Sequence, residues 1–192
     1  MPCAMMHLLC ARIYDDDAPI AFYIGNEAPD CMDIRELKDV SHFRIYTDDR
    51  DQRLSEYARS LDLNDPYQLG VILHLYTDML WDFGPMKEHK ESYCGEDWFH
   101  DYRRQIRLIG TEMYKRFEWS KQLWQDMSTA PVSLYSALDC FPGEKIKDYV
   151  RFNRDRDRSG EIGQSPDFPH DKMVEFCHDT VSSFRAWIEK IN

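Results

Sequence analysis

The stretch from residue 66 to residue 83 constrains the fold of this chain more than any other part of the sequence. It has the length of a helix of about five turns, and its part from Leu69 to Trp81 is mostly apolar. Proline stands at its first position, Asp65 precedes it as a cap, and Gly84 follows it as a stop. His74 and Asp78 interrupt the apolar run. Because residues four apart lie on the same side of a helix, both side chains project from one face.

The face that carries His74 and Asp78 also carries the large apolar side chains of Tyr67, Val71 and Trp81. We therefore expect this face to point into the protein. A buried carboxylate is costly unless it is paired with a cation, hydrogen-bonded or bound to a metal ion. A local hydrogen bond between the histidine and the aspartate would meet this requirement, and so would a metal site.

The rest of the chain predicts further helices and no sheet. Apolar residues recur at helical spacing, and no stretch alternates convincingly over several strands. The expected helices cover residues 5–14, 20–24, 51–61, 98–127 with a break near Gly110 or Glu118, 131–138, 146–150 and 172–191. Residues 154–169 are expected to form an exposed loop. With 192 residues and 43% apolar content, the sequence predicts an all-α multi-helix bundle in a single domain spanning residues 1–192.

The formal net charge of −11 argues against broad binding to nucleic acids or to anionic membranes, because an acidic surface repels polyphosphates. Any phosphate-bearing substrate then needs local positive charge, for which a metal ion is the first candidate. Basic residues do cluster between Arg103 and Arg116, and again between Lys145 and Arg158. Such clusters are more often solvated helix faces than binding surfaces.

The apolar run from Ala4 to Ala11 is short, His7 interrupts it, and no basic segment precedes it. This pattern is typical neither of a signal peptide nor of a membrane span. The six cysteines are scattered, without the spacing of a metal-binding pair or of a secreted disulfide framework. We therefore expect a reduced, cytoplasmic protein with no integral association with membranes.

Five polar residues stand where apolar ones would be expected, and they form a set of candidate metal ligands: His7, Asp30, His42, His74 and Asp78. Taken singly, some have structural explanations. His7 suits a core histidine with satisfied hydrogen bonds, and Asp30 after a proline suits a turn or a cap. Three imidazoles and two carboxylates together match the ligand set of zinc, nickel, iron or manganese. The combination is more specific than any of its members and predicts a metal centre.

The candidate ligands occur in the order His, Asp, His and then His-x3-Asp along the chain. The segments that contain them are His7, Phe22–Asp30, Ser41-His42-Phe43 and Leu69-Gly-x3-His74-x3-Asp78-x2-Trp81. In this order and spacing the chain resembles the zinc-dependent phospholipase C family, whose fold is shared with P1-type nucleases. The resemblance covers roughly the first 80 residues, and the remainder is similar only in being helical. It implies a helical bundle of the phospholipase C/P1 nuclease type.

The resemblance also implies a ligand assignment. Asp30, His42 and His74 would hold one divalent transition-metal ion. His7 would help to hold a second ion, and Asp78 would bridge the two. Zinc is the first expectation for these ions, with nickel, iron or manganese as alternatives.

Two departures from the family pattern change what the resemblance implies. Secreted family members use an N-terminal tryptophan as a ligand, whereas this chain begins with Met1. They also carry a further histidine set with a glutamate after the His-x3-Asp helix. Here Gly84 stands in the place of the first histidine and Arg104 in that of the glutamate, so a third zinc site is not expected. Asp101 or its neighbour His100 would supply a replacement ligand, and we include Asp101 among the predicted metal ligands.

These observations predict a hydrolase that acts on a small phosphoester substrate with a metal-activated water. Asp30 is the candidate catalytic residue, which would orient or deprotonate that water. Tyr23, Tyr46 and Trp81 would line a pocket, although packing in an aromatic core explains them equally well. Two alternatives stay open. One is a non-catalytic metal-binding helical module. The other is an HD-type phosphohydrolase, because His100-Asp101 matches the two-residue signature of that group.

Overall fold

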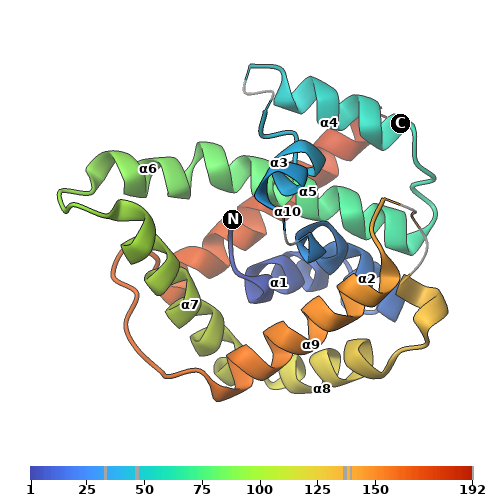
Figure 1. Ribbon diagram of the computed structural model, residues 1–192. Helices are drawn as coiled ribbons and strands as arrows, with labels where there is room; N and C mark the ends of the chain where they lie inside the picture. Colours follow the sequence, from blue (N-terminus) through green and yellow to red (C-terminus); the bar gives the residue numbers. More distant parts are fainter. Residues whose placement is uncertain (33, 46–47, 136–137, 139, 192) are drawn as a thin grey trace.

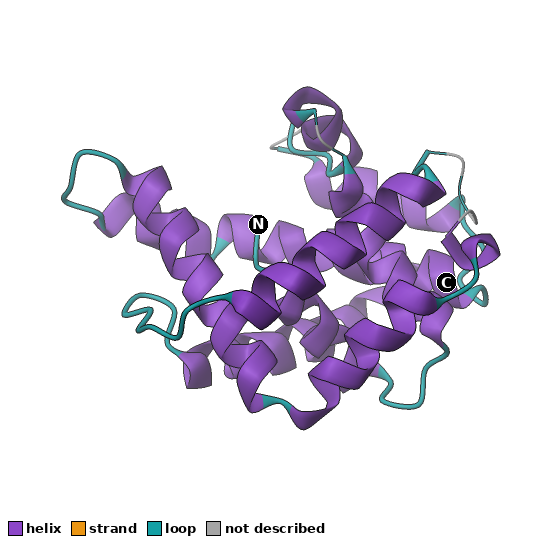
Figure 2. Cartoon of the chain, turned by 60° about the horizontal axis from the view of Figure 1, so that its bottom comes forward, coloured by secondary structure: helices purple, strands orange, loops and turns teal. Residues whose placement is uncertain are grey.

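A computed structural model describes residues 1–32, 34–45, 48–135, 138 and 140–191 of the chain. Helices are the only regular elements in these ranges (Figure 1, Figure 2), which confirms the predicted all-α class. In chain order the elements are α1 (Ala4–Tyr14), α2 (Ile20–Glu27), the 3-10 helix η1 (Ala28–Cys31), α3 (Arg35–Ser41), α4 (Arg50–Arg59), α5 (Pro66–Phe83), α6 (Pro85–Ser92), α7 (Trp98–Arg116), α8 (Glu118–Thr129), the 3-10 helix η2 (Val132–Tyr135), α9 (Gly143–Ser159) and α10 (His170–Ile191). Among the helices so described, none is long and apolar enough to cross a bilayer.

The helix α5, which carries His74 and Asp78, has the predicted bounds. At its start the side chain of Asp65 accepts a hydrogen bond from the backbone amide of Gln68 at 3.0 Å, as expected of a cap. The helices α1, α4 and α10 begin and end within two residues of their predicted ranges. The predicted break near Glu118 is also confirmed, because α7 ends at Arg116 and α8 begins after one intervening residue.

Other predicted bounds are wrong. α2 continues through Gly25 to Glu27, and α6 was not expected, because the proline that follows Gly84 starts a new helix instead of a loop. The range 131–138 contains a 3-10 turn in its described part.

The predicted exposed loop 154–169 is wrong at its start, because α9 continues to Ser159. The buried stripe of α9 has helical spacing, and its members are Ile146, Val150, Asn153 and Asp157. The last two members are polar, so the periodicity of apolar residues stops before the helix does.

The buried apolar side chains form one contiguous cluster that extends from Cys3 to Ile188. α1 lies inside the bundle, where it packs on α2, α5, α7 and α10 (Figure 1), and its residues from Ala4 to Ala11 are all buried. α5 packs on α1, α2, α4 and α10. The histidines of both helices, His7 and His74, therefore lie in the interior.

Two glycines allow α2 and α5 to cross in close contact. Gly25 packs on the backbone of Tyr67, and Gly70 packs on the backbone of Phe22. A Cβ atom at either glycine would overlap a carbonyl oxygen of the other helix. The side chain of Asn26 reinforces the contact by donating a hydrogen bond to the carbonyl of Gly70 at 3.3 Å. This crossing fixes η1, which directly follows α2, against the middle of α5.

Candidate metal centre

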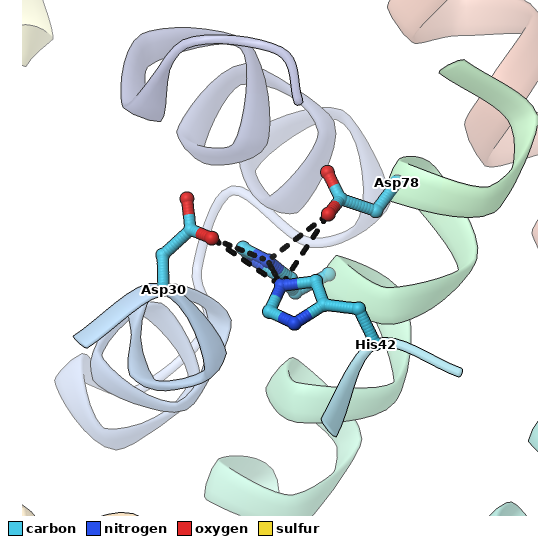
Figure 3. Close-up of side chains that lie close together, drawn as sticks. Asp30, His42 and Asp78 are labelled. Carbon is cyan, nitrogen blue, oxygen red and sulfur yellow. Dashed lines mark hydrogen bonds and ion pairs between the residues drawn. The ribbon is translucent and has the colours of Figure 1, made fainter. Parts of the chain in front are cut away.

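Four regions of the chain bring the five candidate ligands of the first 80 residues together in the core. Asp30 lies on η1, and His42 caps the end of α3. His74 and Asp78 lie one turn apart on α5, and His7 comes from α1. All five residues are buried, with exposed fractions of 4% or less. Figure 3 shows the carboxylates of Asp30 and Asp78 directed toward the His42 ring from two sides.

Backbone geometry at the end of α3 holds His42 in place. Phe43 takes a left-handed conformation, with φ of 56°, directly after the cap. Its amide donates to the carbonyl of Val40 at 3.0 Å, and the amide of Arg44 donates to the carbonyl of Asp39 at 2.8 Å. This pair of bonds is a common way to end an α-helix. It presents His42 to η1 and α5 and brings Arg44 to the same centre.

The hydrogen bonds on the outer side of the two central imidazoles decide which ring nitrogen carries the proton. Nδ1 of His42 lies 2.8 Å from the carbonyl oxygen of Lys38. Nδ1 of His74 lies 2.6 Å from the carbonyl oxygen of Asn26. A carbonyl oxygen only accepts hydrogen bonds, so each Nδ1 is the N–H donor. In the neutral rings both Nε2 atoms therefore present lone pairs, and these two atoms face each other at 3.3 Å.

The two carboxylates add acceptor oxygens at the same point. Oδ1 of Asp30 lies 3.3 Å from Nε2 of His42 and 3.7 Å from Nε2 of His74. Oδ2 of Asp78 lies 3.4 Å and 4.0 Å from the same two nitrogens. Burial and the neighbouring His7 hold the pKa of His74 well below its ordinary value, so this ring is neutral. When both rings are neutral, four acceptor atoms converge within 4.8 Å of one another, and a cation among them would relieve their repulsion.

The spacing of these atoms suits a tetrahedral transition-metal ion. Zinc bonds to imidazole nitrogen and carboxylate oxygen are about 2.0 to 2.2 Å long, which puts neighbouring ligand atoms about 3.3 to 3.6 Å apart. The separations between His42 and the other three residues, 3.3 to 3.4 Å, match this spacing, whereas His74 lies 3.7 and 4.0 Å from the two carboxylates. Both imidazoles also make the outer hydrogen bond to a carbonyl that metal-bound histidines ordinarily make. The residues present therefore fit a metal ion.

His7 lies beside this group of four. Its ring stacks on that of His74 with the ring centroids 3.8 Å apart, and its Nε2 lies 3.4 Å from Oδ1 of Asp78. Within the described part of the chain, neither ring nitrogen of His7 has a hydrogen-bond partner. Asp78 thus directs one carboxylate oxygen toward His7 and the other toward His42 and His74.

Two basic side chains lie against the buried carboxylates. Nζ of Lys38 lies 2.6 Å from Oδ1 of Asp30, and Nη2 of Arg44 lies 2.5 Å from Oδ2 of Asp78. Burial opposes ionisation of Asp30, but Lys38 and the two central histidines hold its pKa well below the ordinary value. Burial likewise opposes ionisation of Asp78, but Arg44 and His7 hold its pKa well below the ordinary value. Both carboxylates are therefore ionised at neutral pH.

Sequence reasoning missed several residues around the centre, among them Lys38 and Arg44. Tyr149, on α9, donates a hydrogen bond from its hydroxyl to Oδ2 of Asp30 at 3.0 Å. Asp82 continues the i, i+4 series of α5 by one turn and binds Arg44 at 2.8 Å. That spacing is a signal from which Asp82 could have been found. Tyr149 has no such signal, because 119 positions separate it from Asp30.

Asp101 and His100 lie elsewhere. His100 is exposed, and Asp101 belongs with His89 and Asp167 to a second group whose candidate ligand atoms lie within 4.8 Å of one another. Asp101 accepts hydrogen bonds of 2.7 Å from two side chains of its own helix, α7. The structure therefore does not bring the predicted replacement ligand to the buried centre, because α7 directs residue 101 toward other partners.

The aromatic residues that were candidates for a pocket lining pack in the core instead. The hydroxyl of Tyr23 donates to a backbone carbonyl at 3.1 Å, and Nε1 of Trp81 donates to the hydroxyl of Tyr102 at 2.7 Å. Tyr46 lies outside the described residues. A cavity of about 850 Å³ does open beside Asp30, but other residues, from η1, α3, α7 and α9, contribute to its wall.

We compared the chain with protein-family models, curated proteins and solved structures, and none of the three comparisons found a match. The resemblance to the zinc-dependent phospholipase C family therefore rests on the sequence segments that carry the candidate ligands. The geometry of the buried centre is independent of that resemblance, since it follows from distances and hydrogen bonds in this chain alone.

Proposed function

We propose that this chain is a metal-dependent hydrolase of phosphoric esters with a fold of the phospholipase C/P1 nuclease type. One observation carries the proposal. The imidazoles of His42 and His74 turn their N–H groups outward, and together with two carboxylates they direct four acceptor atoms at one buried point. Such a point attracts a cation, and the two-histidine, two-carboxylate set suits zinc first and nickel, iron or manganese next.

The contacts of Asp78 support a centre of one or two ions. We assign Asp30, His42 and His74 to a first ion, and His7, whose ring nitrogens have no hydrogen-bond partner among the described residues, to a second. Asp78 faces both positions, one oxygen toward each, which supports its role as a bridge. A divalent ion bound by these side chains would lower the pKa of a bound water and neutralise phosphoryl oxygens as charge develops on them.

Asp30 is the residue to which we assign the positioning and deprotonation of water. Its Oδ1 faces the two imidazoles, and its Oδ2 accepts the hydrogen bond from Tyr149, so the carboxylate is held in one orientation. Asp30 also lies in the wall of the cavity of about 850 Å³. A small phosphoester that enters this cavity therefore reaches the centre at Asp30, the carboxylate to which we assign the role of general base.

The test is turnover of an aryl phosphodiester and an aryl phosphomonoester by zinc-loaded protein, with metal content measured on the same samples. We expect slow hydrolysis of the diester that a chelator abolishes. Asp30→Asn should lower kcat by about 100-fold or more, the usual contribution of a general base. Asp101→Asn is the matched control, because it removes a carboxylate of the second group, and its rate should equal that of wild type.

Two results would count against the proposal. Equal rates for wild type and metal-loaded Asp30→Asn would remove Asp30 from the reaction. No turnover of either ester by fully loaded wild-type protein would contradict the hydrolase itself. It would support a second candidate, a metal-binding helical module without turnover, which is favoured by the ion pairs of Lys38 and Arg44 with the two ligand carboxylates.

A further inference from the structure

The cavity beside Asp30 brings together basic residues that are far apart in the sequence. Residues of η1, α3, α7 and α9 contribute to its wall. Of these elements, α9 packs on α7 (Figure 1) and on η1. The two basic clusters of the sequence, one on α7 and one on α9, thus both contribute to a single cavity that adjoins the candidate metal centre.

The charge of the cavity wall is opposite to that of the chain. Its cationic side chains are Lys38, Arg103, Arg107, Lys145 and Arg156, against the two carboxylates of Asp30 and Asp148. The whole chain carries a formal net charge of −11. Positive charge concentrated in a concave site raises the local concentration of anions, even on a protein whose remaining surface repels them.

Arg103 and Arg107 are the cations of this wall that have charge to offer a ligand. They lie one turn apart on α7, so their side chains share a face, and both are exposed. Neither makes an ion pair or a hydrogen bond with any residue that the structure describes. By contrast, Lys38 pairs with Asp30 at 2.6 Å, and Arg156 pairs with its neighbour Asp157 at 2.8 Å.

The same wall also offers apolar surface. Phe152 on α9 is 63% exposed and supplies most of it, whereas Ile106, between the two arginines on α7, is buried. An inorganic anion would leave this surface in water. An organic molecule with an anionic group would cover it and place its charge at the arginines.

We propose that this cavity selects small organic phosphoric esters that carry a second anionic group, a carboxylate or another phosphate, and that Arg103 and Arg107 bind that group. The selection of a substrate rests on the proposed hydrolase function. The binding of an organic anion rests on the cavity alone, so the two parts can fail separately.

The binding part is tested by calorimetry with benzene-1,3-disulfonate, an organic dianion that coordinates metals weakly, titrated into the protein as purified. We expect binding that weakens with salt and falls about tenfold in Arg103→Gln/Arg107→Gln, the effect of losing two partly exposed charge contacts. The matched control, Arg104→Gln/Arg116→Gln, removes the same charge from α7 at residues that pair outside the cavity with Asp101 and Glu112. Absence of binding, or equal loss in both variants, would overturn the proposal.

The selection part compares two aryl phosphodiesters that differ only in a carboxylate on the alcohol that does not leave, free in one and methylated in the other. We expect kcat/KM to favour the free carboxylate by about tenfold through KM, and this preference to vanish in Arg103→Gln/Arg107→Gln. Equal kcat/KM for the two esters in wild type would overturn the selection. If neither ester is hydrolysed while disulfonate binding depends on the arginines, the hydrolase function fails and the anion site stands.

Discussion

Two groups of histidine and aspartate occur among the residues that the structure describes, and they differ in the placement of their hydrogen-bond donors. The buried centre consists of Asp30, His42, His74 and Asp78, and the peripheral group consists of His89, Asp101 and Asp167. In each group the candidate ligand atoms lie within 4.8 Å of one another. Residue types and spacing alone therefore do not separate the two.

The difference lies in where the hydrogen-bond donors stand. In the buried centre the N–H groups of both histidines point outward, and acceptors face acceptors. In the peripheral group a donor stands between the carboxylates, because Nε2 of Gln105 donates to Asp101 at 2.7 Å and to Asp167 at 2.6 Å. Nδ1 of His89 also lies 3.1 Å from Asp167, whose side chain is half exposed. Lys38 and Arg44 neutralise the two carboxylates of the buried centre, but they donate no hydrogen bond to the two Nε2 atoms that face each other. The placement of donors, more than residue type, thus favours a metal ion in the buried centre.

The largest effect on stability is expected at the helix crossing that positions the buried centre. Gly70→Ala places a methyl group against the carbonyl oxygen of Phe22, so α2 and α5 must move apart. We expect the free energy of unfolding to fall by about 3 kcal/mol, as in severe overpacking, and zinc affinity to fall with it. The control is Gly110→Ala on α7, where the added methyl meets the side chain of Cys3 at 3.1 Å. Its change should be below about 1 kcal/mol in urea titrations. Equal losses of unfolding free energy and of zinc affinity in the two variants would show that the crossing does not position the centre.

The ion pairs of the two groups should contribute differently to stability, and this difference is expected to be smaller than the effect of Gly70→Ala. Lys38–Asp30 and Arg104–Asp101 have nearly the same length, 2.6 and 2.7 Å, but Lys38 is 15% exposed and Arg104 is 52% exposed. Lys38→Met leaves a buried carboxylate without its cation, so we expect a loss of about 2 kcal/mol in chelator-treated protein. Zinc should restore most of this loss, because the ion replaces the missing charge.

The control, Arg104→Met, should change stability by less than about 1 kcal/mol with or without zinc. A loss in Lys38→Met that zinc leaves unchanged would contradict a metal at Asp30.

The smallest expected effect is a dependence of the free energy of unfolding on pH. Burial, with the nearby charge of Asp30, raises the pKa of Glu27 well above its ordinary value, whereas hydrogen bonds from Arg104 and Gln105 lower the pKa of Asp101. From roughly pH 5.5 upward, the native protein keeps a proton on Glu27 that the unfolded chain has released. The free energy of unfolding therefore falls as pH rises, by at most about 1.4 kcal/mol per pH unit until the pH reaches the folded pKa of Glu27.

Urea titrations at pH 5.5 and 6.5 measure this slope. Glu27→Gln should remove it, because glutamine carries no titrating proton. Asp101→Asn should leave it in place, since a lowered pKa affects stability only as the pH falls into the acid range, below the ordinary pKa of an aspartate. The same slope in wild type and Glu27→Gln would show that Glu27 is ionised in the native protein.

The sequence identifies the members of the buried centre because each interrupts an apolar context, and the structure brings them together. It does not identify Lys38, since charged residues are ordinary on short helices, nor Tyr149, which only the fold brings to Asp30. Asp101 was chosen by analogy with a family pattern, and the direction of α7 takes it elsewhere. The sequence does not identify the cationic cavity either, because its charges come from separate helices that each resemble a solvated surface.

The most direct test of the buried centre is the metal content of purified wild type, His74→Gln and His89→Gln, measured by elemental analysis before and after incubation with zinc. We predict about one to two equivalents of transition metal in wild type and in His89→Gln, with a thermal shift on adding zinc. His74→Gln, which removes one of the facing acceptors, should bind zinc about 100-fold more weakly or worse. Wild-type protein that contains no metal and gives no thermal shift with zinc, nickel or manganese would contradict the account. Equal metal content in wild type and His74→Gln would contradict it as well.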